Sequence, residues 1–190
     1  RLVIDPLRVL DYCLTTDGAT CVILTTSDRA RDCRKAPIYV SGLSPVVMPT
    51  VPHNKDLMGL DGKSHLGPRE KLNLANTRLT YEMSGLSPGD IDVFYCYDAF
   101  TPMVLFSLEV SLLCGIGEAA DFVRGSRTRP GGSFPVNPHG GLLSESHCGT
   151  RNHIVDAVRQ LRGECGPHQV RGAEAAMYAS PKGDSVILRR

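Results

Sequence analysis

The sequence predicts an α/β fold in which helices cover a layered sheet, and three observations support this prediction. Residues 91–97 form a continuous apolar run of the length expected for a buried strand. Segments with helical spacing flank this run, at residues 69–84 and 101–113. Two β-rich runs follow a third helical segment near the end of the chain. Helices and strands that alternate in this way are typical of a layered α/β protein.

The composition excludes several classes of protein. The chain has 190 residues, of which 42% are hydrophobic and 22% charged, which is ordinary for a soluble globular protein. This length suffices for one well-cored domain or slightly more. The net charge of +1 does not provide the basic surface that nucleic acid requires. No apolar run approaches the roughly 20 residues needed to cross a bilayer. We therefore expect no nucleic-acid partner and no membrane span.

The seven cysteines do not form a metal-binding or disulfide pattern. A structural zinc site requires paired ligands at short spacing, and the chain has no Cys-x-x-Cys pair, so we predict no metal. Cys21, Cys96 and Cys114 lie inside apolar runs and are predicted to be small core residues. Unpaired cysteines favour a reducing compartment, and we expect a cytoplasmic location.

The first third of the chain divides into two segments of different character. Residues 1–41 contain two strand-like runs, at 19–25 and 36–40. Residues 42–68 are dense in proline and glycine and have no helix or strand signal. Long loops of this kind are usually functional, and we expect this one to lie over the substrate side or the dimer side. The chain begins with Arg1, and we expect it to be a piece of a longer polypeptide.

Residues 69–190 are predicted to form the main α/β layer. The helix over residues 69–84 should end before Gly85, which suits the position just after a helix. The strand over residues 92–97 should be an interior strand of the sheet. Thr101 can cap the next helix, and Pro102 suits its first turn.

The last part of the chain should contain one helix and two strands. After a loop over residues 115–138, a helix is predicted over residues 147–162 and is expected to pack against the central strand. Gly163 should end this helix. Two final strands are predicted at residues 173–179 and 185–188, joined by a short turn.

Two stretches are candidates for chemistry. Residues 95–101 follow the central strand, and polar groups at the carboxyl end of such a strand occupy the usual ligand crevice of α/β sheets. Residues 137–149 form a glycine-rich loop that leads into the predicted third helix. A helix N-terminus lowers the pKa of a nearby histidine, and a neutral histidine can act as a base or stabilise an oxyanion. Tyr97 and His147 are therefore the best-placed side chains.

Each of these side chains also has a purely structural explanation. A tyrosine that ends a buried strand is most often a packed aromatic residue with a satisfied hydroxyl. A histidine near a helix start is more often a cap or a surface residue. Cys148 beside His147 suggests a nucleophile and its base, but adjacent residues on a helix do not face each other.

Four segments, taken in order, resemble the thiolase superfamily, and the first, residues 10–13 with 16–19, is similar to a strand and turn of the family's first half. Residues 97–100 read Tyr-Asp-Ala-Phe and resemble the thiolase segment Asn-Glu-Ala-Phe, which in sterol-carrier thiolases is His-Asp-Cys-Phe. Residues 137–147 resemble the motif Asn-Pro-Ser-Gly-Gly followed by Ser-x-Gly-His. Residues 160–170 resemble Gln-Leu-Arg-Gly-x-x-Gly-x-x-Gln-Val. Each motif is weak alone, but the ordered set is specific.

The resemblance implies a layered αβαβα fold built from two similar halves. Residues 1–41 would be the terminal strands of the N-terminal half, 42–68 the loop, and 69–190 the C-terminal half. In this family the nucleophilic cysteine lies in the first half, upstream of these motifs, so the chain alone is expected to be inactive. The resemblance also implies a homodimer.

The motifs match the family's oxyanion site only in part. His147 matches the histidine of the oxyanion hole, and Tyr97 stands where the family has asparagine or histidine. Ser146 and Cys148 replace the glycine and proline that flank the histidine. The family's C-terminal Cys-x-Gly-Gly motif is absent, and residues 178–184 occupy its place. These departures are more similar to thiolase-like lipid-transfer aldolases, which cleave steroid side-chain β-hydroxyacyl-CoA and work with a small OB-fold, zinc-ribbon partner.

The sequence is therefore consistent with two functions. The first is a thiolase-like enzyme that acts on carbon–carbon bonds of lipid or sterol side-chain acyl-CoA, as an acyltransferase or a retro-aldolase, with Tyr97 and His147 as catalytic residues. The alternative is a non-catalytic acyl-CoA-binding, lipid-binding or lipid-transfer protein, favoured by the missing C-terminal cysteine. No cofactor is expected beyond the coenzyme A of the substrate. The residues assigned to substrate binding are Asp98, Phe100, Asn137, Gly140 and Gly141.

Overall fold

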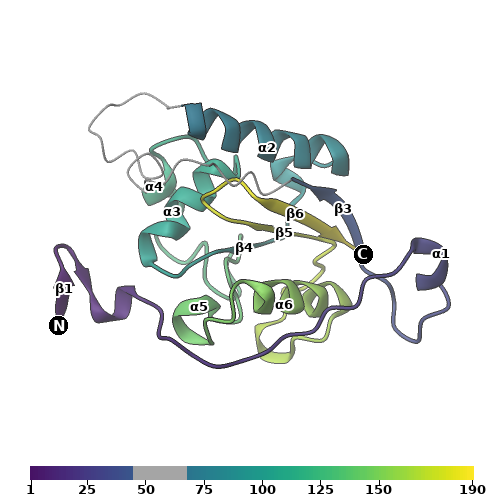
Figure 1. Cartoon of the computed structure of the whole chain (residues 1–190). Helices are drawn as coiled ribbons and strands as arrows, with labels where there is room; N and C mark the ends of the chain where they lie inside the picture. The colour runs from purple at the N-terminus through teal and green to yellow at the C-terminus, as the bar shows by residue number, and fades with distance from the viewer. Residues whose placement is uncertain (45–67) are drawn as a thin grey trace.

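The computed structural model describes residues 1–44 and 68–190 (Figure 1). Most of the loop predicted over residues 42–68 lies outside the described residues. None of the helices in the described part of the chain combines the length and the apolar composition that a membrane-crossing segment needs.

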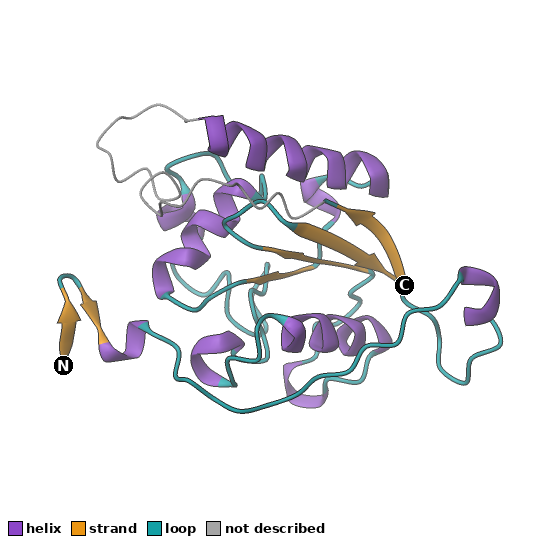
Figure 2. Cartoon of the chain, viewed as in Figure 1, coloured by secondary structure: helices purple, strands orange, loops and turns teal. Residues whose placement is uncertain are grey.

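A four-stranded mixed sheet forms the centre of the molecule (Figure 2). Its strands are ordered β3 (Tyr39–Leu43), β6 (Ser185–Arg189), β5 (Ala175–Ala179) and β4 (Val93–Cys96). β4 and β5 are parallel, and the other two pairs are antiparallel. Every residue of β4 and β5 is buried, which agrees with their unbroken apolar sequences.

Helices cover both faces of this sheet. α2 (Pro68–Ser84) and α3 (Thr101–Val110) lie on one face, and α5 (Gly141–Ser144) and α6 (Arg151–Arg162) lie on the other (Figure 1). The side chains of β4 alternate between the two layers, as the period of a strand requires. The predicted layered α/β fold is therefore confirmed.

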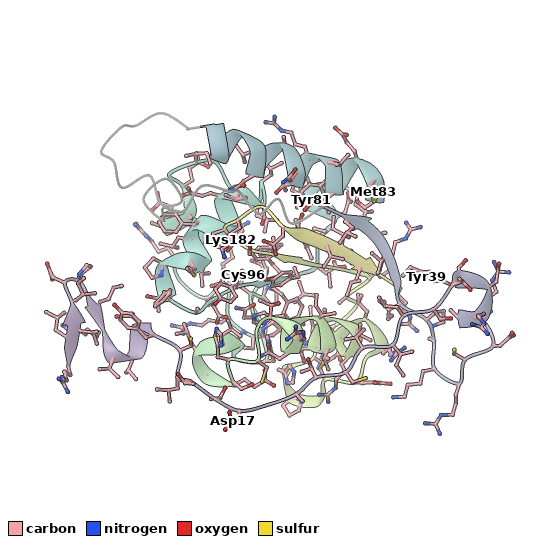
Figure 3. All side chains as sticks on the ribbon, viewed as in Figure 1. Asp17, Tyr39, Tyr81, Met83, Cys96 and Lys182 are labelled. Carbon is pink, nitrogen blue, oxygen red and sulfur yellow. The ribbon has the colours of Figure 1, made fainter. Side chains whose placement is uncertain are left out.

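The two sides of β4 belong to separate hydrophobic clusters. Phe94 and Cys96 pack with Leu108 of α3, whereas Val93 and Tyr95 pack with Leu161 of α6. Cys96 consequently lies in the middle of the molecule, between the two helical layers (Figure 3).

Short elements complete the described chain. An N-terminal hairpin extends away from the sheet. The arm that follows it runs along the side of α5 and α6 (Figure 1). These remaining elements are β1 (Leu2–Ile4), β2 (Leu7–Arg8), η1 (Val9–Asp11), α1 (Ser27–Ala30), η2 (Pro88–Asp90), α4 (Ala119–Phe122) and η3 (Gly166–His168).

Most elements predicted for residues 69–190 are confirmed, with shifts of a few residues at their ends. α2, β4, α3, β5 and β6 all occur where the sequence places them. Thr101, however, does not cap α3. Phe100 is the N-cap, and the Thr101 hydroxyl donates instead to Asp11 Oδ1, at 3.0 Å.

The prediction that residues 92–97 form an interior strand is wrong. Within the described chain β4 is the last strand of the sheet and pairs with β5 alone. A loop satisfies its other edge, because the Phe94 amide donates to the Pro135 carbonyl at 3.0 Å and the Asn137 amide donates to the Phe94 carbonyl at 2.9 Å. A buried strand needs backbone partners on both sides, and an irregular segment supplies them here.

The predicted start of the third helix at His147 is also wrong, because α6 begins at Arg151. Gly149 and Thr150 have φ values of +62° and +73°, in the left-handed region that a right-handed helix cannot contain. His147 therefore lies in the loop between α5 and α6, and the dipole of α6 does not act on it in the predicted way.

The predictions for residues 1–41 need the largest corrections. Residues 19–25 do not form a strand, and the second run becomes β3, which begins three residues late, at Tyr39. Ile23 and Leu24 are 87% and 80% exposed, so no neighbouring strand covers them within the described chain. Cys21 is exposed and Cys114 half-buried, so only Cys96 of the three predicted core cysteines is fully buried.

Candidate active site

The structure brings Tyr97 and His147 into direct contact, although they are 50 residues apart in sequence. The Tyr97 hydroxyl lies 3.1 Å from His147 Nε2, and the two rings meet edge to face. Tyr97 follows β4, and both side chains are half-buried. Burial raises the pKa of Tyr97, as do the neighbouring Cys13 and Asp98. A hydroxyl and an imidazole at this distance can exchange a proton, but their catalytic role stays a prediction.

The N-terminal arm forms one side of this site. The backbone amide of His147 donates to Thr16 Oγ1 at 2.8 Å, and the Cys13 amide donates to the Ala99 carbonyl at 3.0 Å. Burial raises the pKa of the Cys13 thiol, so the thiol form is favoured over the thiolate. Both residues lie in the segments 10–13 and 16–19, which resemble a strand and turn of the thiolase first half, but neither was predicted to belong to the site.

Asp98 is buried against the glycine-rich loop. Its Oδ1 accepts a hydrogen bond from the Leu142 amide at 2.8 Å. Gly141 has φ +64°, and a Cβ at this position would collide with the Asp98 carboxyl group. Glycine at position 141 therefore permits the close approach of the loop to Asp98.

The other residues predicted to bind substrate contact protein groups in this structure. Asn137 pairs with the backbone of Cys96: its Oδ1 accepts from the Cys96 amide at 2.9 Å, and its Nδ2 donates to the Cys96 carbonyl at 3.1 Å. Phe100 packs edge to face on Tyr12, with ring centroids 5.0 Å apart. Gly140 is the N-cap of α5, with φ +105°. Substrate binding by Asp98, Phe100, Asn137, Gly140 and Gly141 stays a prediction.

Tyr178 of β5 is a further member of this region that sequence reasoning did not single out. Its ring stacks on His153 with centroids 5.8 Å apart, and burial raises the pKa of its hydroxyl despite a hydrogen bond with Thr150. The available signal was its place at the start of residues 178–184, where the thiolase superfamily has its C-terminal cysteine motif.

Two buried histidines connect Asp98 to α6. His153 Nδ1 lies 3.0 Å from His139 Nε2. The outer nitrogen of each ring faces a carboxyl group, because His153 Nε2 lies 3.5 Å from Asp98 Oδ1 and His139 Nδ1 lies 3.8 Å from Asp156 Oδ2. No role was predicted for these histidines, since their spacing fits no metal site.

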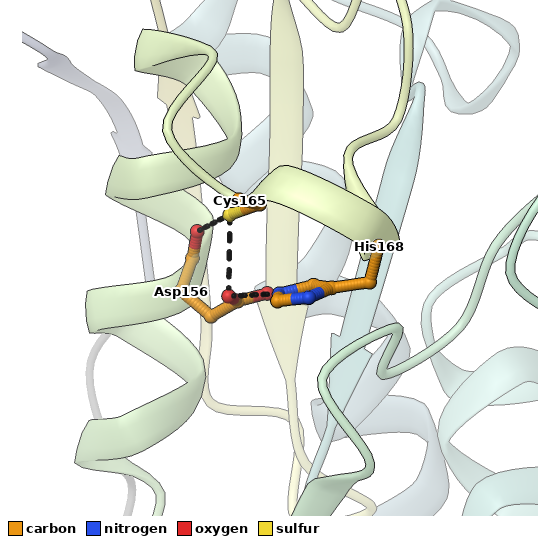
Figure 4. Close-up of side chains that lie close together, drawn as sticks. All are labelled: Asp156, Cys165 and His168. Carbon is orange, nitrogen blue, oxygen red and sulfur yellow. Dashed lines mark hydrogen bonds and ion pairs between the residues drawn. The ribbon is translucent and has the colours of Figure 1, made fainter.

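Asp156, Cys165 and His168 form the group of side chains in the described chain that could hold a metal ion (Figure 4). Their ligand atoms lie within 4.8 Å of one another. Asp156 Oδ1 is 2.9 Å from His168 Nε2 and 3.3 Å from Cys165 Sγ, and Tyr95 donates to Asp156 Oδ2 at 2.7 Å. Burial raises the pKa of Cys165 to about 12, so the thiol keeps its proton and can donate it to the carboxylate. Hydrogen bonds account for this cluster, and the expectation of no metal stays a prediction.

Stability is expected to fall as the pH drops below 6.5. Burial lowers the pKa of His153 from its ordinary 6.5 to about 3 and also lowers that of His139. Below pH 6.5 the unfolded chain therefore binds more protons on these two residues than the folded chain does. Burial raises the pKa of Asp98, so the folded chain retains at most one proton that the unfolded chain releases. The free energy of unfolding should then decrease as the pH falls from about 6 toward 5, at a slope that approaches ~1.4 kcal/mol per pH unit for each net proton that the unfolded chain binds.

Urea unfolding at pH 7, 6 and 5 measures this dependence. The variant His153→Gln removes one of the two titrating imidazoles and should reduce the slope by about 1.4 kcal/mol per pH unit. Equal slopes in the variant and the unmodified chain would contradict the assignment to His153.

Comparison with known proteins places these features among thiolase-related sequences. A family described as thiolase C-terminal domain-like matches residues 74–184. The chain is 38% identical over 167 residues to a 17-hydroxy-3-oxo-4-pregnene-20-carboxyl-CoA lyase of Mycobacterium tuberculosis, covering 86% of this chain and 41% of the lyase. It is 34% identical over 163 residues to a steroid side-chain-cleaving aldolase of Thermomonospora curvata, covering 86% and 40% of the two chains.

A human protein and a solved structure extend the comparison. Sterol carrier protein 2 of Homo sapiens is 33% identical over 182 residues, which are 92% of this chain and 32% of that protein. The structure of an Ltp2-ChsH2(DUF35) aldolase matches with a TM-score of 0.80 and 29% identity, over 100% of this chain and 49% of that chain. The chain thus spans less than half the length of these relatives.

Proposed function

Because this chain belongs to the thiolase C-terminal domain-like family, we propose that it is part of an enzyme that breaks or forms a carbon–carbon bond in an acyl-CoA. The observation that supports this most is the contact between the Tyr97 hydroxyl and His147 Nε2, at 3.1 Å. A proton donor and its partner at this distance suit a reaction that transfers a proton to or from a substrate oxygen or carbon.

Within this class we propose retro-aldol cleavage of a β-hydroxyacyl-CoA with a lipid or sterol side chain. A base removes the proton of the β-hydroxyl group, the bond between Cα and Cβ breaks, and a ketone and an enolate of the shorter acyl-CoA form. The enolate then takes a proton at Cα, so no external reagent is consumed. Tyr97 would transfer the proton, and His147 would accept it or polarise the thioester oxygen. Two of the relatives named above are a CoA lyase and a side-chain-cleaving aldolase, which supports this choice over thiolysis.

Several features of the whole protein belong to this proposal. We propose that the activity needs segments beyond these 190 residues, because the chain spans 41% of the related lyase, and that the chain alone is inactive. The division into residues 1–41, 42–68 and 69–190 would then reflect the end of one half, a loop and the second half. A homodimer in the cytoplasm, with no cofactor beyond the coenzyme A of the substrate, completes the proposal. The similar aldolase structure is named for two components, which supports a partner protein, and we propose that this partner is a small OB-fold, zinc-ribbon protein.

The second candidate is a protein that binds or transfers acyl-CoA or lipid without catalysis. Its support is the similarity to sterol carrier protein 2, at 33% identity over 92% of this chain. This candidate predicts binding of acyl-CoA with no turnover of any substrate.

A turnover assay separates these functions. The 190-residue chain, and a protein extended to the length of its relatives, would each be mixed with a β-hydroxyacyl-CoA or with a β-ketoacyl-CoA plus coenzyme A. We expect the extended protein to release a ketone and a shorter acyl-CoA from the β-hydroxyacyl-CoA. Thiolysis of the β-ketoacyl-CoA alone would favour the acyltransferase instead. Binding in an acyl-CoA titration, with neither substrate consumed, would favour the second candidate.

A further inference from the structure

Four buried ionisable side chains form a continuous chain that begins at Asp98, the residue next to Tyr97. Asp98 faces His153, His153 faces His139, and His139 faces Asp156, with separations of 3.5, 3.0 and 3.8 Å between the facing atoms. The four side chains are at most 7% exposed. We call Asp98, His153, His139 and Asp156 the buried acid–histidine chain.

Polar and titratable groups from several neighbouring segments contact the buried acid–histidine chain. Asp156 accepts hydrogen bonds from Tyr95 of β4, from Cys165 just before η3 and from His168 of η3. Glu145, after α5, lies 3.5 Å from His139 Nε2 and is 45% exposed. Tyr178 of β5 stacks on His153. The Leu142 amide donates to Asp98, and Asn137 also contributes a hydrogen bond that lowers its pKa.

The number of protons in the buried acid–histidine chain determines whether both of its carboxyl groups can be ionised. Each neutral imidazole carries one proton, and one of the two must lie between the rings, because His153 Nδ1 and His139 Nε2 are 3.0 Å apart. Of the two outer ring nitrogens, one therefore carries a hydrogen and the other a lone pair. Both face carboxyl groups, at 3.5 and 3.8 Å, and neither makes a hydrogen bond in the described chain.

A lone pair that faces an ionised carboxylate inside the protein is repelled and leaves both groups unsatisfied. One more proton removes this conflict. It could sit on a ring or on either carboxyl group, and the surroundings distinguish these positions. Burial disfavours a charged imidazole at His153 and at His139.

Hydrogen-bond donors stabilise the carboxylate form of Asp156 more than that of Asp98. Asp156 accepts from Tyr95 at 2.7 Å, from His168 at 2.9 Å and from Cys165 at 3.3 Å, which stabilises its carboxylate form. Asp98 has neutral amide donors, foremost the Leu142 amide at 2.8 Å, and its pKa is raised by burial. The additional proton therefore belongs on Asp98.

We propose that the buried acid–histidine chain holds three protons rather than two, and that the third makes Asp98 a neutral carboxylic acid at neutral pH. The proton of the Asp98 acid then faces the lone pair of His153 Nε2, His153 Nδ1–H donates to His139 Nε2, and His139 Nδ1–H faces the Asp156 carboxylate. Each ring carries its proton on Nδ1. Asp98 Oδ1 can donate this proton while it accepts from the Leu142 amide, as a hydroxyl oxygen does.

The arrangement gives Asp98 a role as a positioning residue for Tyr97, which rests on the proposed function. An ionised Asp98 would raise the pKa of Tyr97, so a neutral Asp98 makes the tyrosine hydroxyl easier to deprotonate. If each of the three protons moves by one contact, Asp98 becomes a carboxylate and Asp156 a carboxylic acid. No atom enters or leaves, so the charge beside Tyr97 can change without access of water.

Infrared difference spectroscopy of the 190-residue chain without substrate tests the proposal. The spectrum of the Asp98→Asn variant is subtracted from that of the unmodified chain at pH 7. We expect the difference to contain the carbonyl stretch of a protonated carboxylic acid. The matched control is Asp121→Asn, since Asp121 is 79% exposed and should contribute only carboxylate bands. Loss of carboxylate bands alone in Asp98→Asn would overturn the proposal.

A second measurement uses the unmodified chain, so it does not depend on whether a variant folds. Histidine labelled with ¹⁵N reports by NMR which ring nitrogen carries the proton. We expect neutral rings with the proton on Nδ1 at both His139 and His153 at pH 7. A proton on Nε2 of both rings, or a charged ring at either position, would overturn the proposal. Neither measurement involves turnover, so these spectra, together with an extended protein that consumes no substrate, would refute the proposed function and leave the protonation of Asp98 standing.

Discussion

Replacement of Tyr97 by phenylalanine is expected to lower kcat by roughly 10²–10⁴-fold, the usual contribution of a general acid or base. The change removes the hydroxyl that lies 3.1 Å from His147 Nε2 and keeps the ring that packs against the imidazole. Since the hydroxyl acts mainly in the transition state, KM should change little. Turnover of a β-hydroxyacyl-CoA by the protein extended to the length of its relatives measures both constants.

Tyr39→Phe provides the matched control. Tyr39 lies on β3 at the far edge of the sheet and is 39% exposed (Figure 3). It should retain normal turnover. A Tyr97→Phe variant that is as active as the Tyr39→Phe variant would remove Tyr97 from the mechanism. If Tyr97 and His147 act as a unit, the double variant Tyr97→Phe/His147→Gln should lose little more than the worse single variant.

Replacement of Asp156 by alanine is expected to lower the free energy of unfolding by about 3–5 kcal/mol. The variant removes the acceptor for the Tyr95 hydroxyl, the His168 ring and the Cys165 thiol at once. Tyr95 is completely buried, so its hydroxyl could not find water in place of the carboxylate. Each buried donor left without a partner costs about 1–3 kcal/mol.

Urea unfolding at pH 7 measures this loss. Asp121→Ala is the control, because its carboxylate pairs with Arg124 at the surface and should contribute less than about 1 kcal/mol. Asp156→Asn keeps the shape and one acceptor oxygen and should fall between the two variants. A loss below roughly 1 kcal/mol in Asp156→Ala would show that the hydrogen bonds to Asp156 do not hold α6 and η3 in place.

The stabilisation that Asp156 provides depends on pH and is lost at low pH. Burial by itself would raise the pKa of Asp156, but the hydrogen bonds from His168 and Tyr95 lower it on balance. Asp156 therefore stabilises the fold above its ordinary pKa, and this contribution is lost as the pH falls through the lowered value. This titration lies below the window in which His139 and His153 act.

The sequence alone determined the features that depend on neighbouring residues. The apolar run that becomes β4 and the helical spacing that becomes α2 are local patterns, and both elements formed where they were predicted. Gly85 and Gly163 ended their helices because both adopt the left-handed conformation that glycine tolerates. The motifs around residues 97–100, 137–147 and 160–170 identified the thiolase superfamily, and they led to Tyr97 and His147.

The tertiary structure decided which distant groups meet, because a buried polar atom can be satisfied by any part of the chain that reaches it. It placed β4 at the end of the sheet, with a loop as its second partner, and it delayed the start of α6 by four residues. It also brought Asp98 and His139, from two separate loops, together with His153 and Asp156 of α6. Sequence spacing carries no signal for such a cluster, since its hydrogen bonds and its shared proton depend on burial and on separations of a few ångströms.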